Sequence, residues 1–376
     1  MTEEQEALAK REKKKFKIPW GLVAFYGVCL LLGVLLGKML DEKEFEDFFR
    51  NILPAVLFLV ISMYLHFIIH EAGHMVLGWM TGYRFVSFRV GSFMWEKQKD
   101  GKIRFSRFSL AGTGGQCLMA PPDYNNGKFP YRLYNLGGGL ANFILSGCCV
   151  LLMLLPVAEP VALFLNVSAF CGIGLGAVNL IPLKKFNNDG SNLVEIGKSP
   201  AAKRAFWLQM RINQETANGV RLKDMPAEWF ESQTENRRNV MVTSIDVLAA
   251  SRLMDGLQLN EAEKLMRSLM KEDCLAGVYK NLLVFELSFL EILKGEAGFY
   301  TEKTEDKQVA AFAKAMKNFP SILRWQYAKM KLLQKNETEA EKIKAAFEKM
   351  ANTYPHPCEI EGEKEMMHLV DAVECS

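Results

Sequence analysis

The sequence predicts a mainly α-helical protein whose first half is a polytopic membrane helix bundle and whose second half is a soluble helical domain. Long apolar runs recur between residues 18 and 183, whereas residues 196–376 are rich in charge and contain no such run. Of the 376 residues, 49% are hydrophobic and 24% are charged, a composition that excludes an intrinsically disordered chain. The net charge of +3, with no basic stripe interleaved with aromatic residues, argues against nucleic acid as a partner.

Four apolar runs predict four transmembrane helices, because about 20 residues suffice to cross the hydrocarbon core of a bilayer. The runs cover residues 18–37, 51–83, 133–158 and 160–183. The first run is longer than the core of a signal peptide, and no convincing cleavage site follows it, so we expect a retained helix. The sequence therefore predicts a multi-pass protein of the cell membrane, with the lipid bilayer around its first half.

Lys and Arg residues predict the orientation of these helices, because they are enriched on the cytosolic side of a membrane. Residues 10–17 carry six basic groups and one acid, and residues 84–132 carry nine basic groups and three acids. Residues 41–50, in contrast, carry five acids and two basic groups. We therefore expect both termini in the cytosol. The resulting regions are a basic cytosolic tail, a membrane-embedded domain and a cytosolic helical domain, over residues 1–17, 18–195 and 196–376.

Residues 85–110 predict a β-hairpin at the membrane surface. Apolar and polar residues alternate on both sides of Asp100-Gly101, and an Asp-Gly pair between such runs is a strong hairpin signal. The hairpin could add an extended peptide to its free edge, or it could be purely structural, and the sequence leaves both interpretations open.

His70, Glu71 and His74 form an HExxH motif in the second apolar run. On a helix, His70 and His74 lie four residues apart on one face, so both imidazoles can reach one zinc ion. Glu71 stands beside them, where it can take a proton from the attacking water. Ionisable side chains inside an apolar run are costly and usually functional. The motif therefore predicts one catalytic zinc ion per chain.

A catalytic zinc ion usually has three protein ligands, so the motif lacks one. Asp189 is the one carboxylate between Glu159 and Glu195, and it follows the cytosolic end of the fourth apolar run. It is the predicted third ligand, although Asn-Asp-Gly sequences also form ordinary turns. His66, four residues before His70, could compete as a ligand, but an interfacial or supporting position is the preferred interpretation.

Three motifs make the sequence resemble the site-2 protease family of intramembrane zinc metalloproteases, in its bacterial form without a PDZ domain. They are the HExxH segment, a small-residue-then-asparagine segment and an Asn-x-x-Pro segment followed by Asp-Gly, at His70–His74, Gly137–Asn142, Asn179–Pro182 and Asp189-Gly190. The resemblance covers roughly residues 50–195. The interval of seven residues from Pro182 to Asp189 is longer than the usual interval in the family.

The resemblance implies a role for each site residue. His70, His74 and Asp189 would hold the zinc ion, and Glu71 would be the general base. Asn142 would position the substrate or polarise its carbonyl. The resemblance also implies that the hairpin is a membrane-associated β-segment that engages the substrate.

Residues 196–376 contain no apolar run long enough to span a membrane, and they predict short amphipathic helices. These are expected at residues 204–218, 240–255, 260–271, 276–294, 306–318, 320–334 and 338–352. Glu-Ala-Glu-Lys occurs at 261–264 and again at 339–342, about two helical-pair repeats apart. A tetratricopeptide-like solenoid that binds a protein partner or a substrate tail is consistent with this pattern, and so is an irregular helical bundle.

Two functions compete. The first is a zinc-dependent intramembrane endopeptidase that cleaves membrane-spanning or membrane-associated peptides near the cytosolic face, in regulated proteolysis or peptide maturation. The alternative is a catalytically inactive, protease-like membrane scaffold that acts through its cytosolic helical domain. A metal transporter is disfavoured, because the other three apolar runs contain no further histidine or acid.

Overall fold

The computed structural model describes residues 42–108, 114–125, 127–183, 188–231 and 239–374. The predicted first span and the predicted basic tail lie outside the described residues. The chain divides into two compact units. One contains the residues up to His66 together with Ile144–Gly174, and the other contains Phe67–Phe143 and the residues from Leu175 onward.

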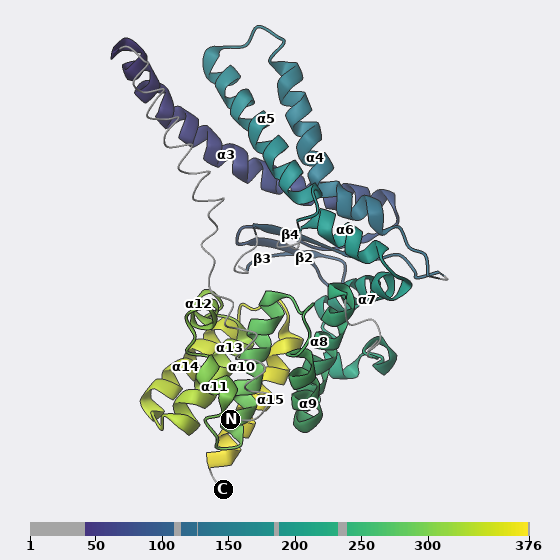
Figure 1. Cartoon of the computed structure of the whole chain (residues 1–376), viewed down its shortest axis with the longest axis vertical. Helices are drawn as coiled ribbons and strands as arrows, with labels where there is room; N and C mark the ends of the chain where they lie inside the picture. Colours follow the sequence, from purple (N-terminus) through teal and green to yellow (C-terminus); the bar gives the residue numbers. More distant parts are fainter. Residues whose placement is uncertain (1–41, 109–113, 126, 184–187, 232–238, 375–376) are drawn as a thin grey trace. The chain divides into compact units, whose positions relative to one another are not determined.

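Three helices of the described chain are long and apolar enough to cross a membrane (Figure 1). They are α3 (Glu42–Met80), with the apolar stretch Pro54–Met80, α4 (Tyr131–Leu152) and α5 (Glu159–Leu180). Helices satisfy their backbone hydrogen bonds internally, which the bilayer core demands of any spanning segment. The second, third and fourth predicted spans therefore have helical counterparts of sufficient length and composition, whereas a total of four spans is not confirmed.

Helix α3 ends three residues before the predicted run ends at Tyr83. The backbone N–H groups of Thr81 and Tyr83 donate to the carbonyl of Gly78, over 2.9 Å and 3.0 Å. Gly82 has a φ of +88°, a left-handed conformation that glycine adopts without strain and that often closes a helix. This turn leads directly into the first strand, so the HExxH motif lies in the last turns of α3, close in sequence to the sheet.

Four antiparallel strands form one sheet in the order β3-β2-β1-β4 (Figure 1). Their bounds are Arg84–Val90 for β1, Phe93–Lys97 for β2, Ile103–Arg107 for β3 and Gly115–Ala120 for β4. The Asp100-Gly101 pair lies in the turn between β2 and β3, with Gly101 at a φ of +84° and Trp95 opposite Phe105. The predicted hairpin at this turn is confirmed.

The sheet is larger than the predicted hairpin over residues 85–110. Gly91, at a φ of +57°, turns the chain between β1 and β2, so this stretch contains three strands rather than two. The fourth strand, β4, pairs with β1 and places Cys117 opposite Phe88. The sequence does not predict β4, because it begins in a glycine-rich segment without alternating residues.

From Asp189 onward the described chain is helical, and its later helices are green to yellow in Figure 1. The α-helices are α6 (Asp189–Gly197), α7 (Pro200–Ala217), α8 (Val240–Asp255), α9 (Leu259–Leu269), α10 (Gly277–Leu293), α11 (Phe299–Lys303), α12 (Lys307–Ala315), α13 (Pro320–Ala328), α14 (Glu337–Ala351) and α15 (Pro357–Glu374). Shorter turns of other helix types are η1 (Leu222–Asp224), η2 (Ala227–Trp229) and η4 (Lys329–Leu333).

Every helix predicted for the soluble half has a counterpart, whereas α6, α11 and α15 are additional. A tetratricopeptide-like repeat is not confirmed, since the helices range from 5 residues in α11 to 18 residues in α15. The predicted boundaries at residues 17 and 195 stay predictions.

Two hydrophobic clusters stabilise the second unit. One joins the sheet to α7 and α8, through Met119 of β4, Leu208 of α7 and Ile245 of α8. The other fills the space among the later helices, with Phe285 of α10 and Phe347 of α14 fully buried. The sheet that follows the HExxH helix is thus held by a shared core with the helical domain.

Candidate metal centre

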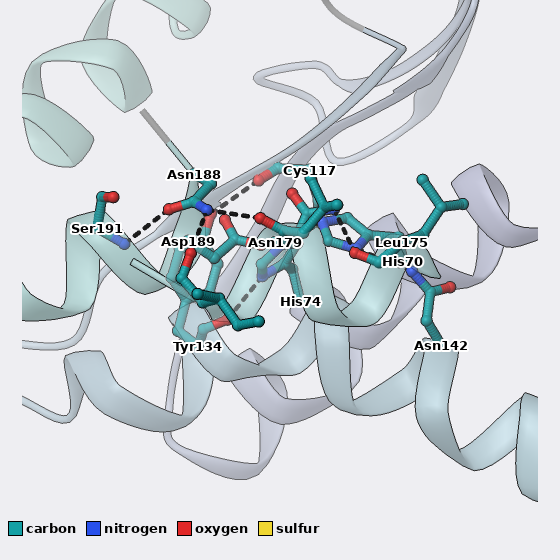
Figure 2. Close-up of polar contacts among 12 residues, drawn as sticks. His70, His74, Cys117, Tyr134, Asn142, Leu175, Asn179, Asn188, Asp189 and Ser191 are labelled. Atoms are coloured by element: carbon teal, nitrogen blue, oxygen red, sulfur yellow. Dashed lines mark hydrogen bonds and ion pairs between the residues drawn. The ribbon is translucent and has the colours of Figure 1, made fainter. Parts of the chain in front are cut away.

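The second unit brings the HExxH motif and the predicted third ligand together (Figure 2). The Nε2 atoms of His70 and His74, both on α3, are 3.2 Å apart. Oδ2 of Asp189, the first residue of α6, lies 3.2 Å from Nε2 of His70 and 3.4 Å from Nε2 of His74. Among the described residues, these side chains form the one cluster of three potential ligands, with all donor atoms within 4.8 Å of one another.

Asn188 connects the end of α5 to the start of α6 and so places Asp189. Its side-chain amide donates to the carbonyl oxygens of Val178, over 2.6 Å, and Ile181, over 2.7 Å, at the end of α5 where helical partners are missing. Its Oδ1 accepts from the backbone N–H of Ser191, over 2.8 Å, and thereby caps α6. One side chain therefore ties the start of α6 to the end of α5, despite the long interval that precedes Asp189.

Gly190 lets the first turn of α6 approach the end of α5. A Cβ atom at this position would overlap the backbone carbonyl of Leu180 and would stand 3.2 Å from the nitrogen of Pro182. Asp189 and Gly190 both belong to α6, so the alternative of an ordinary Asp-Gly turn is wrong. The small residue instead allows the close contact that brings the carboxylate to the two histidines.

A backbone carbonyl orients His74. Nδ1 of His74 lies 2.7 Å from the carbonyl oxygen of Tyr134 in α4. Because a carbonyl can only accept, Nδ1 carries the proton, and Nε2 keeps its lone pair toward the cluster. The ring of Tyr134 stacks on Tyr83 with a centroid separation of 4.9 Å, and its hydroxyl donates to the carbonyl of Cys117 over 2.8 Å. The residue that orients His74 is therefore itself held in place.

The three donor atoms fit a small, positively charged metal ion. An ionised carboxylate and two imidazole nitrogens in one small space are the ligand chemistry of zinc. Oδ2 of Asp189 is buried and has no hydrogen-bond partner in the described chain, as expected for an atom reserved for a metal ion.

Gly138 of α4 keeps the space next to the ligand nitrogens open. A Cβ atom at this position would stand 2.5 Å from Nε2 of His70 and 2.6 Å from Nε2 of His74. Any larger residue would therefore occupy the place that an ion needs. Gly138 belongs to the predicted small-residue segment. A glycine at this position leaves room beside the two histidine nitrogens, in addition to allowing close helix packing.

The part of the chain that carries the HExxH motif matches a known protein family. Residues 58–161 match the model of Peptidase family M50. This confirms the resemblance to the site-2 protease family. No curated protein and no solved structure matches the chain. The M50 match contains Glu71 and Asn142 together with both histidines, and it supports a membrane peptidase in general, whereas Asp189 lies outside it.

Glu71, the predicted general base within the M50 segment, is packed against strand β4. A Cβ atom at Gly115 would stand 2.6 Å from Oε1 of Glu71, so the glycine backbone lies directly on the carboxylate. The backbone of Cys117 hydrogen-bonds the same carboxylate. Strand β4, which the sequence does not predict, therefore holds Glu71, which the sequence predicts as the general base.

Asn142, on α4, is fully buried, and its side-chain amide nitrogen lies 3.3 Å from Nδ1 of His70. The structure thus places Asn142 against one of the candidate ligands (Figure 2). Its predicted contact with substrate stays a prediction.

His66 is not part of the metal cluster. Its side chain, in the first unit, is fully buried, and Nε2 lies 2.9 Å from the carbonyl oxygen and 3.3 Å from the hydroxyl oxygen of Ser168. These contacts link α3 to α5 within that unit. They favour the supporting position for His66 over the competing-ligand alternative.

Sequence reasoning missed Asn188, Tyr134 and Gly138 as supporting residues. Asn188 had a usable signal, because an asparagine directly before a short helical segment is typical of an N-cap. Tyr134 acts through its backbone carbonyl, which every residue possesses, so no sequence signal exists for it. The role of Gly138 depends on the distance between two helices and becomes visible only in the folded chain.

Proposed function

We propose that the protein is a zinc-dependent intramembrane endopeptidase that cleaves membrane-spanning or membrane-associated peptide segments near the cytosolic face. The observation that carries the proposal is the convergence of His70, His74 and Asp189 at the end of an apolar helix. The M50 match over residues 58–161 supports a peptidase. The three long apolar helices support a membrane location.

In this proposal His70, His74 and Asp189 hold one zinc ion, and Glu71 is the general base. A bound zinc ion would polarise the scissile carbonyl and lower the pKa of a water molecule. Glu71 takes the proton of the attacking water and passes it to the nitrogen of the leaving amine, the two proton transfers that peptide hydrolysis needs. Its contacts with β4 keep the carboxylate in place for both transfers.

Asn142 orients His70 in this proposal. The oxygen and nitrogen of an asparagine amide have nearly the same shape, and with the oxygen toward Nδ1 the histidine donates its Nδ1–H to it. Nε2 of His70 then keeps a lone pair for the metal ion, as the Tyr134 carbonyl ensures for His74. Such outer hydrogen bonds commonly fix the tautomer of a metal-binding histidine.

The proposed peptide-binding edge is β4. Within the described chain, β3 and β4 are the edge strands of the sheet, and β4 is the one that contacts Glu71. A helical substrate buries its carbonyls in its own hydrogen bonds, so it must unwind before hydrolysis. An unwound segment that pairs with β4 regains backbone hydrogen bonds and runs beside Glu71.

We further propose a cell-membrane protein with both termini in the cytosol, whose helical domain binds a protein partner or the tail of the substrate. The alternative of a catalytically inactive scaffold is not favoured. The side chains that a peptidase needs are all present, and the three candidate ligands converge.

The test is cleavage of single-span reporter peptides by the detergent-purified protein, with a fluorophore and a quencher flanking the cytosolic half of each apolar segment. Glu71→Gln should reduce turnover at least about a hundredfold, because the base contributes that much or more. It should retain about one zinc ion per chain, because Glu71 is not a ligand. Asp189→Asn should lose zinc and activity together.

Glu159→Gln is the control, since this exposed carboxylate at the start of α5 lies outside the site. It should match the wild type in zinc content and turnover. Wild-type turnover by zinc-loaded Glu71→Gln would overturn the mechanism. A wild type that neither binds zinc nor cleaves any reporter would favour the scaffold, as would a cellular function that survives Glu71→Gln but not removal of residues 200–376.

A further inference from the structure

A buried arginine outside the HExxH motif lies behind strand β4. Arg89, on β1, is 2% exposed and is one of the largest fully buried side chains of the described chain. Burying a guanidinium is costly unless its N–H groups are hydrogen-bonded. The hydrogen-bond partners of Arg89 therefore indicate which part of the structure it stabilises.

The Arg89 guanidinium joins two backbone segments that meet at the start of β4. Its Nη1 donates to the carbonyl of Gly91 over 2.9 Å, and its Nη2 donates to the carbonyl of Gly115 over 3.4 Å. Two backbone contacts lie next to these Arg89 hydrogen bonds. Val90 pairs with Gly115 in the sheet, and the N–H of Gly91 donates to the carbonyl of Gly114 over 2.8 Å. The side chain therefore ties the turn after β1 to the first residue of β4.

Gly115 is also the residue that lies on Glu71. The space between its Cα and the Glu71 carboxylate is too small for a methyl group. Two positions further along β4, the backbone of Cys117 hydrogen-bonds the same carboxylate. Any shift of the beginning of β4 is therefore transmitted to the position of Glu71.

We propose that Arg89 is a positioning residue for Glu71: it holds Gly115 and the start of β4 in the place that keeps the Glu71 carboxylate ready for proton transfer. This inference rests on the proposed function. In this proposal Arg89 acts on Glu71 through Gly115. Misplacing a general base by a fraction of an ångström lowers the rate of the chemical step more than it lowers substrate binding.

The experiment compares Arg89→Met, Arg89→Lys and Arg84→Met with the wild type and with Glu71→Gln, using the reporter peptide that the wild type cleaves fastest. Arg84 is the matched control, because it starts the same strand but is exposed. All rates are expressed per zinc-loaded chain. The absorption spectrum of the cobalt-substituted protein reports independently on the metal ligands.

Arg89→Met should reduce kcat by about ten- to a hundredfold, with KM within about twofold of the wild type and an unchanged cobalt spectrum. Arg89→Lys should recover part of kcat, because one ammonium can reach one of the two carbonyls. Arg84→Met should match the wild type.

A wild-type kcat per zinc-loaded chain for Arg89→Met would overturn the inference. So would equal losses of zinc and activity in that variant, because they would show a purely structural role. If the wild type and Glu71→Gln cleave equally well, the proposed function fails, and this outcome is distinct from a failure confined to the Arg89 variants.

Discussion

Two buried polar clusters of the second unit differ in how their charges are balanced. In the helical domain, Arg324 is 1% exposed and lies between two carboxylates. Its Nη2 donates to both oxygens of Glu286, over 2.7 Å and 2.6 Å, and its Nε donates to Glu363 over 2.5 Å. Opposite charges therefore face one another, and the chain itself provides both signs.

At the candidate metal centre, by contrast, three potential metal-ligand atoms face one another. The Nε2 atoms of His70 and His74 and a carboxylate oxygen of Asp189 point at one another (Figure 2). No Lys or Arg of the described chain forms an ion pair with Asp189. The difference teaches that the chain itself supplies the cation of the Arg324 cluster, whereas the His-His-Asp cluster could hold a cation from outside the chain.

The largest expected effect comes from filling the space at the metal centre. Gly138→Ala places a Cβ atom next to both ligand nitrogens, so zinc per chain should fall from about one to near zero, and reporter cleavage should be lost with it. Metal analysis of the purified variant measures this.

Gly147→Ala is the matched control on the same helix, because a Cβ atom there meets nothing within 4 Å. Alanine favours a helix over glycine, so neither change should weaken α4. Full zinc occupancy in Gly138→Ala would show that the ion does not sit at the three converging atoms.

The next prediction concerns the Arg324 cluster. Arg324→Met leaves Glu286 and Glu363 without their shared cation, so the free energy of unfolding of the helical domain should fall by about 3–5 kcal/mol. Zinc per chain should not change. Urea titration of the full chain in detergent, followed by circular dichroism, measures the loss.

Lys342→Met removes the cation of the exposed pair with Glu339, and it should change stability by at most about 1 kcal/mol. Loss of zinc in Arg324→Met would contradict the independence of the two clusters.

The last prediction concerns a pH dependence within the same cluster. Burial raises the pKa of Glu363 to about 7, although the charge of Arg324 opposes the shift. The unfolded chain releases this proton near pH ~4.3, so the folded state binds one more proton between that value and pH ~7. The stabilisation from this group is therefore complete below pH ~4.3 and is lost as the pH rises toward ~7.

Glu363→Gln should show a flatter dependence of the thermal midpoint on pH across this window than the wild type. Glu341→Gln, at an exposed position of α14, should keep the wild-type slope. Identical slopes in the wild type and Glu363→Gln would place the titration on another group.

Elements that depend mainly on their own local sequence were predicted well. The apolar stretches of α3, α4 and α5 are visible in composition, and the Asp100-Gly101 turn is visible as a residue pair. Strand β4 escaped prediction because pairing with β1 stabilises it, rather than a regular pattern of its own. The tetratricopeptide-like repeat rested on two short matching segments, which do not impose equal helix lengths.

The sequence by itself indicated the candidate metal ligands on α3, because His70 and His74 need only a helix to share one face, with Glu71 next to them in the sequence. It also indicated Asp189, because no other acid stands in that stretch of the chain. Only the tertiary structure decided how the site is assembled. Asn188 ties the start of α6 to the end of α5, and Arg89 hydrogen-bonds the start of β4, and both depend on distances that only the folded chain sets. Such distances are set by packing and hydrogen bonding across the fold, which residue order does not reveal.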